Sequence, residues 1–230
     1  MRIGLVCPYS LTMPGGVQGQ VLALARSMRR RGHETRVLAP CDGPPPELFV
    51  TPLGNSLPTA ANGSVAPVAP DPAAQFRTIR ALWDEAFDVV HLHEPLAPGP
   101  TVTSLLLKPA PLVGTFHAAG SQPAYTAMKP LVQWGARRLD LRVAVSEDDC
   151  DTMRRDYAIG NVAAIPTGVD TDFFRPSGRE RRVPRSLVFT GSMDWVPNSD
   201  AVEWFCKEIL PLIWQRKPGV KFYVVGKNPP

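Results

Sequence analysis

The stretch that decides the fold is RIGLVCPYSLTMPGGVQGQVLALARSMRRRGHETRVLAP, residues 2–40. It begins with a continuous apolar run, Ile3 to Cys7, as is typical of a strand buried on both faces of a parallel sheet. Apolar residues then recur at helical spacing from Val17 to Met28, and Gly32 stands where a glycine commonly ends a helix. A second strand is predicted over Thr35–Ala39. This order predicts a βαβ unit with parallel strands and a right-handed crossover.

The same alternation of strands and helices continues to about residue 170. The spacing of Phe76, Ile79, Trp83 and Phe87 predicts a helix that carries these side chains on one face. Further helices are predicted at 101–107 and 125–139, and further strands at 49–53, 88–92, 112–116, 141–145 and 162–165. The sequence therefore predicts an α/β fold with a doubly wound, Rossmann-like parallel sheet in residues 1–175.

A second unit is predicted after a linker at residues 176–185, which are polar, basic and rich in turn formers. It consists of a strand at 187–190, the turn GSMDWVPN, a helix, and a strand at 220–225. Pro211 lies inside this helix, so we expect a kink or an early end there. One βαβ unit cannot bury its own apolar faces, so either these strands dock on the first sheet or a second domain begins here. We expect the second alternative, with residues 186–230 as the beginning of a second, truncated Rossmann-like domain.

The composition is that of an ordinary globular protein. Of the 230 residues 44% are hydrophobic and 20% charged, and no run approaches the roughly 18 apolar residues of a membrane span. The four cysteines are far apart and form no CxxC pair, which favours a reducing, cytoplasmic location without a disulfide framework or zinc site. The net charge is +4, with clustered arginines. These clusters are interpreted as solvated helix ends or as a surface for anionic lipid, and nucleic acid is not expected as a partner.

The turn MPGGVQ, residues 13–18, sits at the carboxyl end of the first strand and opens a helix. Ligands gather at this end of parallel strands, and backbone N–H groups at a helix N-terminus favour an anion. A tight turn that binds nothing accounts for the two glycines equally well. The dinucleotide fingerprint G-x-G-x-x-G fails, because Pro14 takes its first place and Ala39-Pro40 stand where an acidic residue is expected.

Ordered blocks along the chain resemble the retaining glycosyltransferases of the GT-B fold, most closely the bacterial phosphatidylinositol mannosyltransferases. After the opening stretch these blocks are NGSVA, FDVVHLHEP, VGTFHA, RVAVSE and IPTGVD, within residues 62–170. The segment VFTGSMDWVPNSDAVEWF resembles the second domain of sugar transferases associated with exopolysaccharide synthesis. The resemblance implies hexose transfer, mannose in the first instance, from a nucleoside diphosphate sugar to a lipid-linked or small hydroxyl acceptor, without a metal or other cofactor.

The resemblance also implies roles for particular residues. The donor's diphosphate and sugar would lie against Gly15 and Gly16, and His117 would be catalytic by orienting the transferred sugar. Further donor contacts are expected from Ser192 and Asn198. Acceptor-binding positions are Tyr9, Gln18, Asn62, Ser64 and Glu94. His91 and His93 alternate along one strand and should share one of its faces.

Some positions depart from the family pattern. Ala61 and Pro67 replace a tyrosine and an arginine near the acceptor phosphate, which argues against phosphatidylinositol as the acceptor. In the second unit, Gly191-Ser192 and Pro197-Asn198 stand where cations for the donor phosphates are common. Two DxD patterns, at 149–151 and 170–172, fall in a helix start and a loop, and neither predicts a metal site. The rival interpretation is a non-catalytic module that binds sugar nucleotides, and a peripheral location on the inner face of the plasma membrane is predicted for either.

Overall fold

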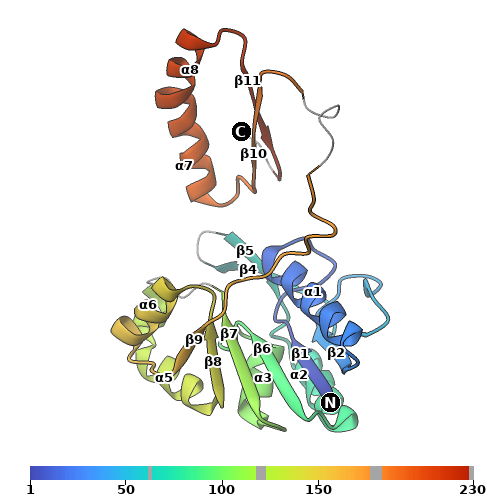
Figure 1. Ribbon diagram of the computed structural model, residues 1–230. Coiled ribbons are helices and arrows are strands. Elements are labelled where there is room, and N and C mark those ends of the chain that lie inside the picture. Colours follow the sequence, from blue (N-terminus) through green and yellow to red (C-terminus); the bar gives the residue numbers. More distant parts are fainter. Residues whose placement is uncertain (62–63, 118–122, 177–182, 228–230) are drawn as a thin grey trace. The chain divides into compact units, whose positions relative to one another are not determined.

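The computed structural model describes residues 1–61, 64–117, 123–176 and 183–227. Contacts divide the chain into two compact units (Figure 1). Unit 1 comprises Met1–Thr59 and Ala66–Asp170, and unit 2 comprises Ala60–Val65 and Thr171–Pro230. Within the described ranges, no helix combines the length and the apolar character that a membrane span requires.

Unit 1 is built on a parallel sheet of seven strands in the order β3-β2-β1-β6-β7-β8-β9. The three on one side are β1 (Arg2–Val6), β2 (Glu34–Ala39) and β3 (Val50–Pro52). The four on the other are β6 (Val89–His93), β7 (Leu112–Phe116), β8 (Leu141–Ala144) and β9 (Val162–Ala164). The predicted α/β, doubly wound architecture is therefore confirmed.

Helices cover both faces of this sheet, and each face has its own apolar core. One core packs helix α1 (Gly16–Arg30) against β1 and β2. The other core joins α2 (Pro72–Glu85), α3 (Pro100–Leu107), α5 (Lys129–Arg138) and α6 (Glu147–Tyr157) to the opposite face. A short helix, α4 (Pro123–Ala127), precedes α5. The predicted helix at 125–139 is thus two helices, since Met128 separates α4 from α5.

The prediction for helix α2 was right about the helix and wrong about its face. Phe76 and Trp83 are 72% and 69% exposed, and the buried side chains are Ala74, Thr78, Ala81 and Leu82. Three of these four, Ala74, Thr78 and Ala81, are small and let α2 lie close to α3, whereas the two bulky aromatics face outward. A second feature that the sequence did not reveal is the pair β4 (Leu57–Ala61) and β5 (Ser64–Val68), predicted as part of a loop.

Unit 2 contains the parallel strands β10 (Ser186–Thr190) and β11 (Lys221–Val225), joined through helices α7 (Val196–Trp204) and α8 (Leu210–Arg216). A π-helical turn, Phe205–Ile209, separates the two helices. It ends two residues before Pro211, which has no N–H to continue the α-helical hydrogen bonding. The predicted interruption at Pro211 is therefore confirmed. The boundaries predicted for the domains, 1–175 and 186–230, remain a prediction.

Candidate functional site

The candidate site lies at the carboxyl edge of the seven-stranded sheet. The chain runs outward from β1 to β3 on one side and from β6 to β9 on the other, so the order reverses between β1 and β6. Loops diverge at such a switch point and leave room for a ligand. Tyr9 follows β1, Glu94 follows β6, and His117 follows β7. The fold thus brings to one edge three residues that the sequence suggested separately.

The two glycines of the MPGGVQ turn have different surroundings. Gly15 precedes α1, and a Cβ there would lie 2.2 Å from Oε1 of Gln18. A Cβ at Gly16 would meet no atom of the described residues within 4 Å. Gly15 is therefore packed by the flexible end of Gln18 in its own turn, whereas Gly16 leaves an open approach to the start of α1. No acidic side chain occupies the first turn of this helix, so the partial positive charge there is not compensated.

Gln18 was predicted to face the acceptor, but the structure gives its side chain a part in the turn. It is buried, and its Nε2 donates a hydrogen bond of 3.5 Å to the carbonyl oxygen of Ser10. The same side chain fills the space beside Gly15. Gln18 therefore ties the start of α1 to the segment that follows β1.

His117 is held at the edge through its backbone and its ring. Its backbone N–H donates to Oε1 of Glu94 at 2.8 Å, and its Nε2 lies 2.9 Å from Nδ1 of His93. Glu94 is buried and has a left-handed backbone, with φ 52°, while its own N–H donates to the carbonyl oxygen of Thr115 at 2.8 Å. Such a conformation is uncommon for a residue with a side chain. The predicted acceptor contact Glu94 is thus also the residue that fixes His117.

Three histidines form a stack beside this contact. The rings of His91 and His93 lie 4.4 Å apart and those of His93 and His117 5.2 Å apart, measured between centroids. The predicted shared face of His91 and His93 is thereby confirmed. His91 also has a hydrogen-bond partner outside the stack, since its Nε2 lies 2.7 Å from Oγ1 of Thr115.

The three histidines favour the neutral form. Burial, and next the charge of His117, lower the pKa of His91 to about 4. Burial lowers the pKa of His117 to about 4 as well. The pKa of His93 lies well below its usual value, first through burial and then through repulsion by His91 and His117. At neutral pH His117 is therefore a hydrogen-bonding group and not a cation.

Glu94 also acts on two tyrosines. Burial, and next the negative charge of Glu94, raise the pKa of Tyr9 and of Tyr125 above the usual tyrosine value. Tyr9 follows β1, whereas Tyr125 belongs to α4, beyond β7. Both phenols stay protonated at neutral pH and can donate a hydrogen bond. Tyr125 was not predicted as a site residue, because nothing in its local sequence marks it.

A hollow of about 760 Å³ lies beside the glycine turn. Apolar side chains dominate its wall: Leu11, Met13, Pro44, Pro46 and Pro58. Asp42 holds this wall together, since its carboxylate accepts hydrogen bonds from the hydroxyls of Ser10 and Ser56, at 2.6 Å and 2.8 Å. Its backbone N–H donates to Thr12 Oγ1 at 3.0 Å.

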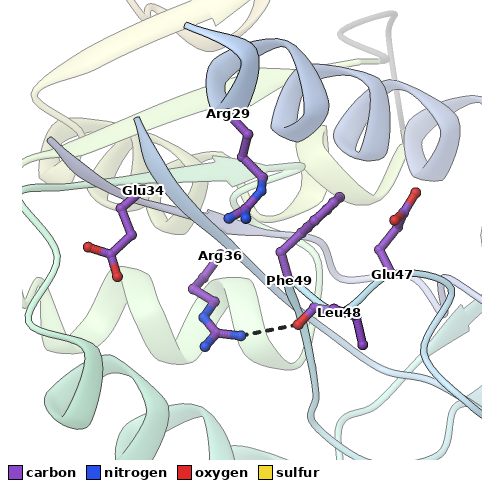
Figure 2. A pocket seen from close by; sticks show the side chains of 6 residues that line it. All are labelled: Arg29, Glu34, Arg36, Glu47, Leu48 and Phe49. Carbon is purple, nitrogen blue, oxygen red and sulfur yellow. Dashed lines mark hydrogen bonds between the residues drawn. The ribbon is translucent and has the colours of Figure 1, made fainter. Parts of the chain in front are cut away.

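A second hollow, of about 450 Å³, lies toward the amino ends of β2 and β3 (Figure 2). Arg36 donates to the carbonyl oxygen of Leu48 at 3.3 Å, and Arg29 lies over the ring of Phe49. Glu34 and Glu47 pair with Arg2 and Arg26. Each charged side chain that lines this hollow thus has a protein partner, and the hollow lies away from the carboxyl edge. It is not the candidate site.

Two predicted acceptor residues receive no side-chain description. Asn62 lies outside the described residues. Ser64 begins β5, but only its backbone is described. Among the residues that are described, no group of three or more histidine, cysteine, aspartate or glutamate side chains is placed to hold a metal ion.

Unit 2 repeats the arrangement of strand, turn and helix. Here a side chain of the turn itself fills the space beside the glycine and bonds to the turn's backbone. Nδ2 of Asn198 donates to the carbonyl oxygen of Ser192 at 2.9 Å. A Cβ at Gly191 would lie 2.7 Å from the same Nδ2. Asp194 pairs with Lys227 at 2.9 Å, and the N–H of Met193 donates to the carbonyl oxygen of Lys227. The predicted donor contact Asn198 thus has a structural partner inside the turn.

Comparisons with known proteins agree with one another. The family model of glycosyltransferase family 4 matches residues 14–173. The chain is 38% identical to a phosphatidyl-myo-inositol mannosyltransferase of Mycobacterium tuberculosis, over 98% of this chain and 60% of that protein. The same enzyme of Mycobacterium leprae is 36% identical, over 99% of this chain and 61% of its own length. The chain thus spans about 60% of the length of these curated relatives.

Solved structures share the fold at low identity. A sucrose-phosphate synthase of Thermosynechococcus elongatus superposes with a TM-score of 0.61 at 12% identity, covering 98% of this chain and 70% of that one. An α-glucosyltransferase in complex with UDP gives 0.60 at 13% identity, covering 100% and 59%. An Anabaena protein in complex with UDP and glucose gives 0.57 at 15% identity, covering 100% and 70%. These likenesses support the GT-B architecture predicted for the chain.

Proposed function

The chain belongs to glycosyltransferase family 4, and from this premise we propose that it takes part in retaining transfer of a hexose from a nucleoside diphosphate sugar to a hydroxyl acceptor. Mannose is the first sugar to test, because the curated relatives are named as mannosyltransferases. A lipid-linked acceptor is supported by the same names. Because the chain spans about 60% of the length of those relatives, donor binding and turnover are separate properties that need separate experiments.

The observation that carries the proposal is the arrangement around the switch point between β1 and β6. There the open side of Gly16 and the first turn of α1, whose N–H groups have no side-chain cap from Gly15, lie at the same sheet edge as Glu94 and His117. A diphosphate requires close backbone approach and N–H donors, and a sugar requires neutral hydrogen-bonding groups beside it. This edge supplies both.

His117 is proposed as the catalytic residue that touches the transferred sugar. A neutral imidazole, fixed by Glu94 through its backbone, can hold a sugar hydroxyl and respond to charge that develops on the ring during transfer. Such a preorganised contact lowers the barrier because it needs no rearrangement when the charge appears. Fixing the backbone of His117 is the contribution of Glu94.

The acceptor is proposed to enter beside Tyr9, which lies near Glu94 and stays protonated. The apolar hollow at Leu11, Met13 and the three prolines suits the hydrophobic part of a lipid-linked acceptor. In unit 2 the backbone of the Gly191-Ser192 turn is proposed as a further donor contact. Asn198 would then act on the donor by shaping this turn.

The test of donor binding compares two glycines of one helix. Gly16 and Gly19 both belong to α1, and a Cβ at either would meet none of the described atoms within 4 Å. We expect Gly16→Ala to weaken binding of GDP-mannose or UDP-glucose about tenfold, a loss of about 1.4 kcal/mol, while Gly19→Ala binds like the wild type. Isothermal titration calorimetry on the 230-residue chain measures both. Equal affinities in the two variants would remove Gly16 from the donor site.

Turnover decides between the enzyme and a binding module. Product formation is followed by mass spectrometry with each sugar nucleotide and with phosphatidylinositol or a soluble inositol acceptor. Transfer that His117→Ala abolishes supports the proposed enzyme. Binding with no transfer to any acceptor favours the module, and neither binding nor transfer contradicts the proposal.

A membrane-facing surface is favoured by the exposed side of α2. Phe76, Arg80 and Trp83 follow one another at helical spacing and face outward, and the aromatic pair is 72% and 69% exposed. Aromatic and cationic side chains together are typical of a helix that lies on an anionic bilayer. We therefore propose peripheral docking through this face, which would bring a lipid-linked acceptor to the protein.

Vesicle binding tests the docking surface. Flotation with phosphatidylserine-containing vesicles should recover the wild type at low salt and release it at high salt, because the attraction of exposed charges is screened. The double variant Phe76→Ser/Trp83→Ser should lose binding, whereas a serine in place of Leu48, which is 98% exposed elsewhere, should not. Wild-type binding that salt and these changes leave untouched would contradict the proposal.

A further inference from the structure

His93 carries an unusual set of contacts for a side chain at a sheet edge. It is 1% exposed, its ring lies between those of His91 and His117, and its Nδ1 is 2.9 Å from Nε2 of His117. Its other nitrogen, Nε2, is buried and has no hydrogen-bond partner in the described part of the chain. Burying a polar atom without a hydrogen-bond partner costs free energy, and the cost depends on whether Nε2 carries a proton. The protonation state of Nε2 in turn constrains which nitrogen of His117 is protonated.

Only two neutral arrangements satisfy the contact between His93 and His117. If Nε2 of His117 donates, His93 accepts at Nδ1 and must carry its own proton at Nε2, as a buried N–H without an acceptor. If Nδ1 of His93 donates instead, its Nε2 is left as a lone pair, and His117 carries its proton at Nδ1. Among buried backbone groups, orphaned N–H donors are rarer than under-satisfied carbonyl acceptors, and we apply the same preference to the ring nitrogen of His93. The second arrangement is therefore favoured.

The surroundings hold His93 in this orientation. Stacking against two rings restricts its rotation, and His91 is itself fixed through Oγ1 of Thr115. Protonation of the stack is opposed, since a charge on any of these rings repels the others. His117 is held from a second direction by Glu94. The stack is thus built to keep one fixed arrangement of protons.

We propose that His93 is a positioning residue that fixes the tautomer of His117, so that the Nδ1–H of His117 is presented as a hydrogen-bond donor. Among the residues that the structure describes, no hydrogen bond to this nitrogen is seen. We expect this N–H to meet a ligand oxygen, either a sugar hydroxyl or a phosphate oxygen. This identification of the ligand rests on the proposed function. The sugar-binding role expected of His117 then depends on a residue that need not touch the sugar.

The tautomer is measurable without any activity. With ¹⁵N-labelled histidine in the 230-residue chain, long-range ¹H–¹⁵N spectra distinguish protonated from unprotonated ring nitrogens. We expect His117 of the wild type to be protonated at Nδ1 and unprotonated at Nε2. A wild-type His117 protonated at Nε2 would overturn the proposal, and this measurement needs no variant to fold.

Two substitutions of His93 sharpen the test. His93→Leu removes the donor at similar volume, and we expect the proton of His117 to move to Nε2. His93→Asn places an amide donor near the former Nδ1 and should restore the wild-type tautomer. His33→Gln, in the turn after α1, serves as the control and should change nothing. An unchanged His117 tautomer in folded His93→Leu would also overturn the proposal.

Ligand binding separates this proposal from the proposed function. GDP-mannose or UDP-glucose should bind about tenfold more weakly to His93→Leu, a loss of about 1.4 kcal/mol that one well-placed hydrogen bond can account for. Binding to His93→Asn should stay within about threefold of the wild type. If the tautomer follows His93 but the wild type binds neither sugar nucleotide, the positioning role stands and the proposed function falls. If the wild type binds a sugar nucleotide but the tautomer of His117 does not depend on His93, the proposed function stands and the positioning role of His93 falls.

Discussion

The chain contains the same local arrangement twice, a parallel strand that ends in a glycine turn and leads into a helix. In unit 1 the turn is MPGGVQ, and in unit 2 it is GSMDWVPN. At Gly16 an added Cβ would meet none of the described atoms within 4 Å, whereas at Gly191 it would lie 2.7 Å from Asn198. The first turn leaves room at its helix start, and the second is filled by its own side chain.

This difference shows that glycine after a strand has two separate uses. One is to let a ligand approach the backbone, as proposed for Gly16. The other is to let the backbone pack against itself: at Gly226, which follows β11, an added Cβ would lie 1.8 Å from the carbonyl oxygen of Gly191. From the sequence alone, the two uses cannot be distinguished, because in each case a glycine follows a predicted strand. Four predictions separate the two turns and the units that carry them.

The largest expected difference between the units is their response to acid. All four histidines lie in unit 1, and burial lowers the pKa of His91 and His117 to about 4. Between pH 6.5 and 4 the unfolded chain therefore binds more protons than the folded one, so the free energy of unfolding decreases as the pH falls. The upper limit is about 3 kcal/mol for each of these two histidines. Hydrogen exchange should show unit 1 losing protection in this window.

The comparison with unit 2 supplies the control for this pH effect. Unit 2 has no histidine, so its amides should keep their protection down to about pH 4.5. Replacing His91 by Gln should flatten the pH dependence of unit 1, and replacing His33 should not. Equal loss of protection in both units above pH 4.5 would show that the histidine stack is not the cause.

The second prediction concerns Gly226, where the backbone and the available space both require glycine. Its φ is 154°, and the neighbouring atom is backbone that cannot move aside. We expect Gly226→Ala to cost about 3 kcal/mol or more, measured as lost amide protection in β10 and β11. Gly160→Ala, at a site where a Cβ would contact no described atom within 4 Å, should stay within about 0.5 kcal/mol of the wild type. Similar costs for both would contradict the packing role.

How far the sequence predicts the fold depends on the element. Strand β7 was predicted at its observed bounds, Leu112–Phe116, because a short apolar run bounded by turn residues is typical of a buried strand. The buried face of α2 was predicted wrongly. The helical spacing of Phe76 and Trp83 suggested that they face the core, but α2 lies close to α3 and buries mostly small residues there instead. The β4–β5 pair was missed because Pro58 and Pro67 disfavour strands.

The candidate site was predictable only in outline. The carboxyl edge followed from the order of strands and helices, and it gathers Tyr9, Glu94 and His117. The hydrogen bond between His93 and His117 was not predictable, because it depends on the register of β6 against β7. Contacts between residues far apart in sequence require the pairing of strands, which local patterns do not determine.

The third prediction tests whether Asn198 serves its own turn. Its bond to the carbonyl oxygen of Ser192 is 2.9 Å long and partly buried. Removing it in Asn198→Ala should cost unit 2 about 1 kcal/mol. Ser192→Ala is the matched control, since the acceptor there is the backbone and the bond survives. If Asn198→Ala is as stable as the control yet binds sugar nucleotides less well, Asn198 is a ligand contact and not a turn residue.

The smallest expected effect concerns Gly15, which packs against Gln18. Its φ is −173°, which any residue adopts, so Gly15→Ala is opposed only by the flexible end of Gln18. We expect a cost of about 1 kcal/mol by urea unfolding, since alanine is also a poorer residue than glycine before a helix. The cost should shrink in Gln18→Ala, because truncating Gln18 removes the clash and couples the two changes by about 0.5 kcal/mol or more. Additive effects would mean that Gln18 does not pack against Gly15, and the likeness between this contact and the packing of Asn198 against Gly191 in unit 2 would then lose its physical basis.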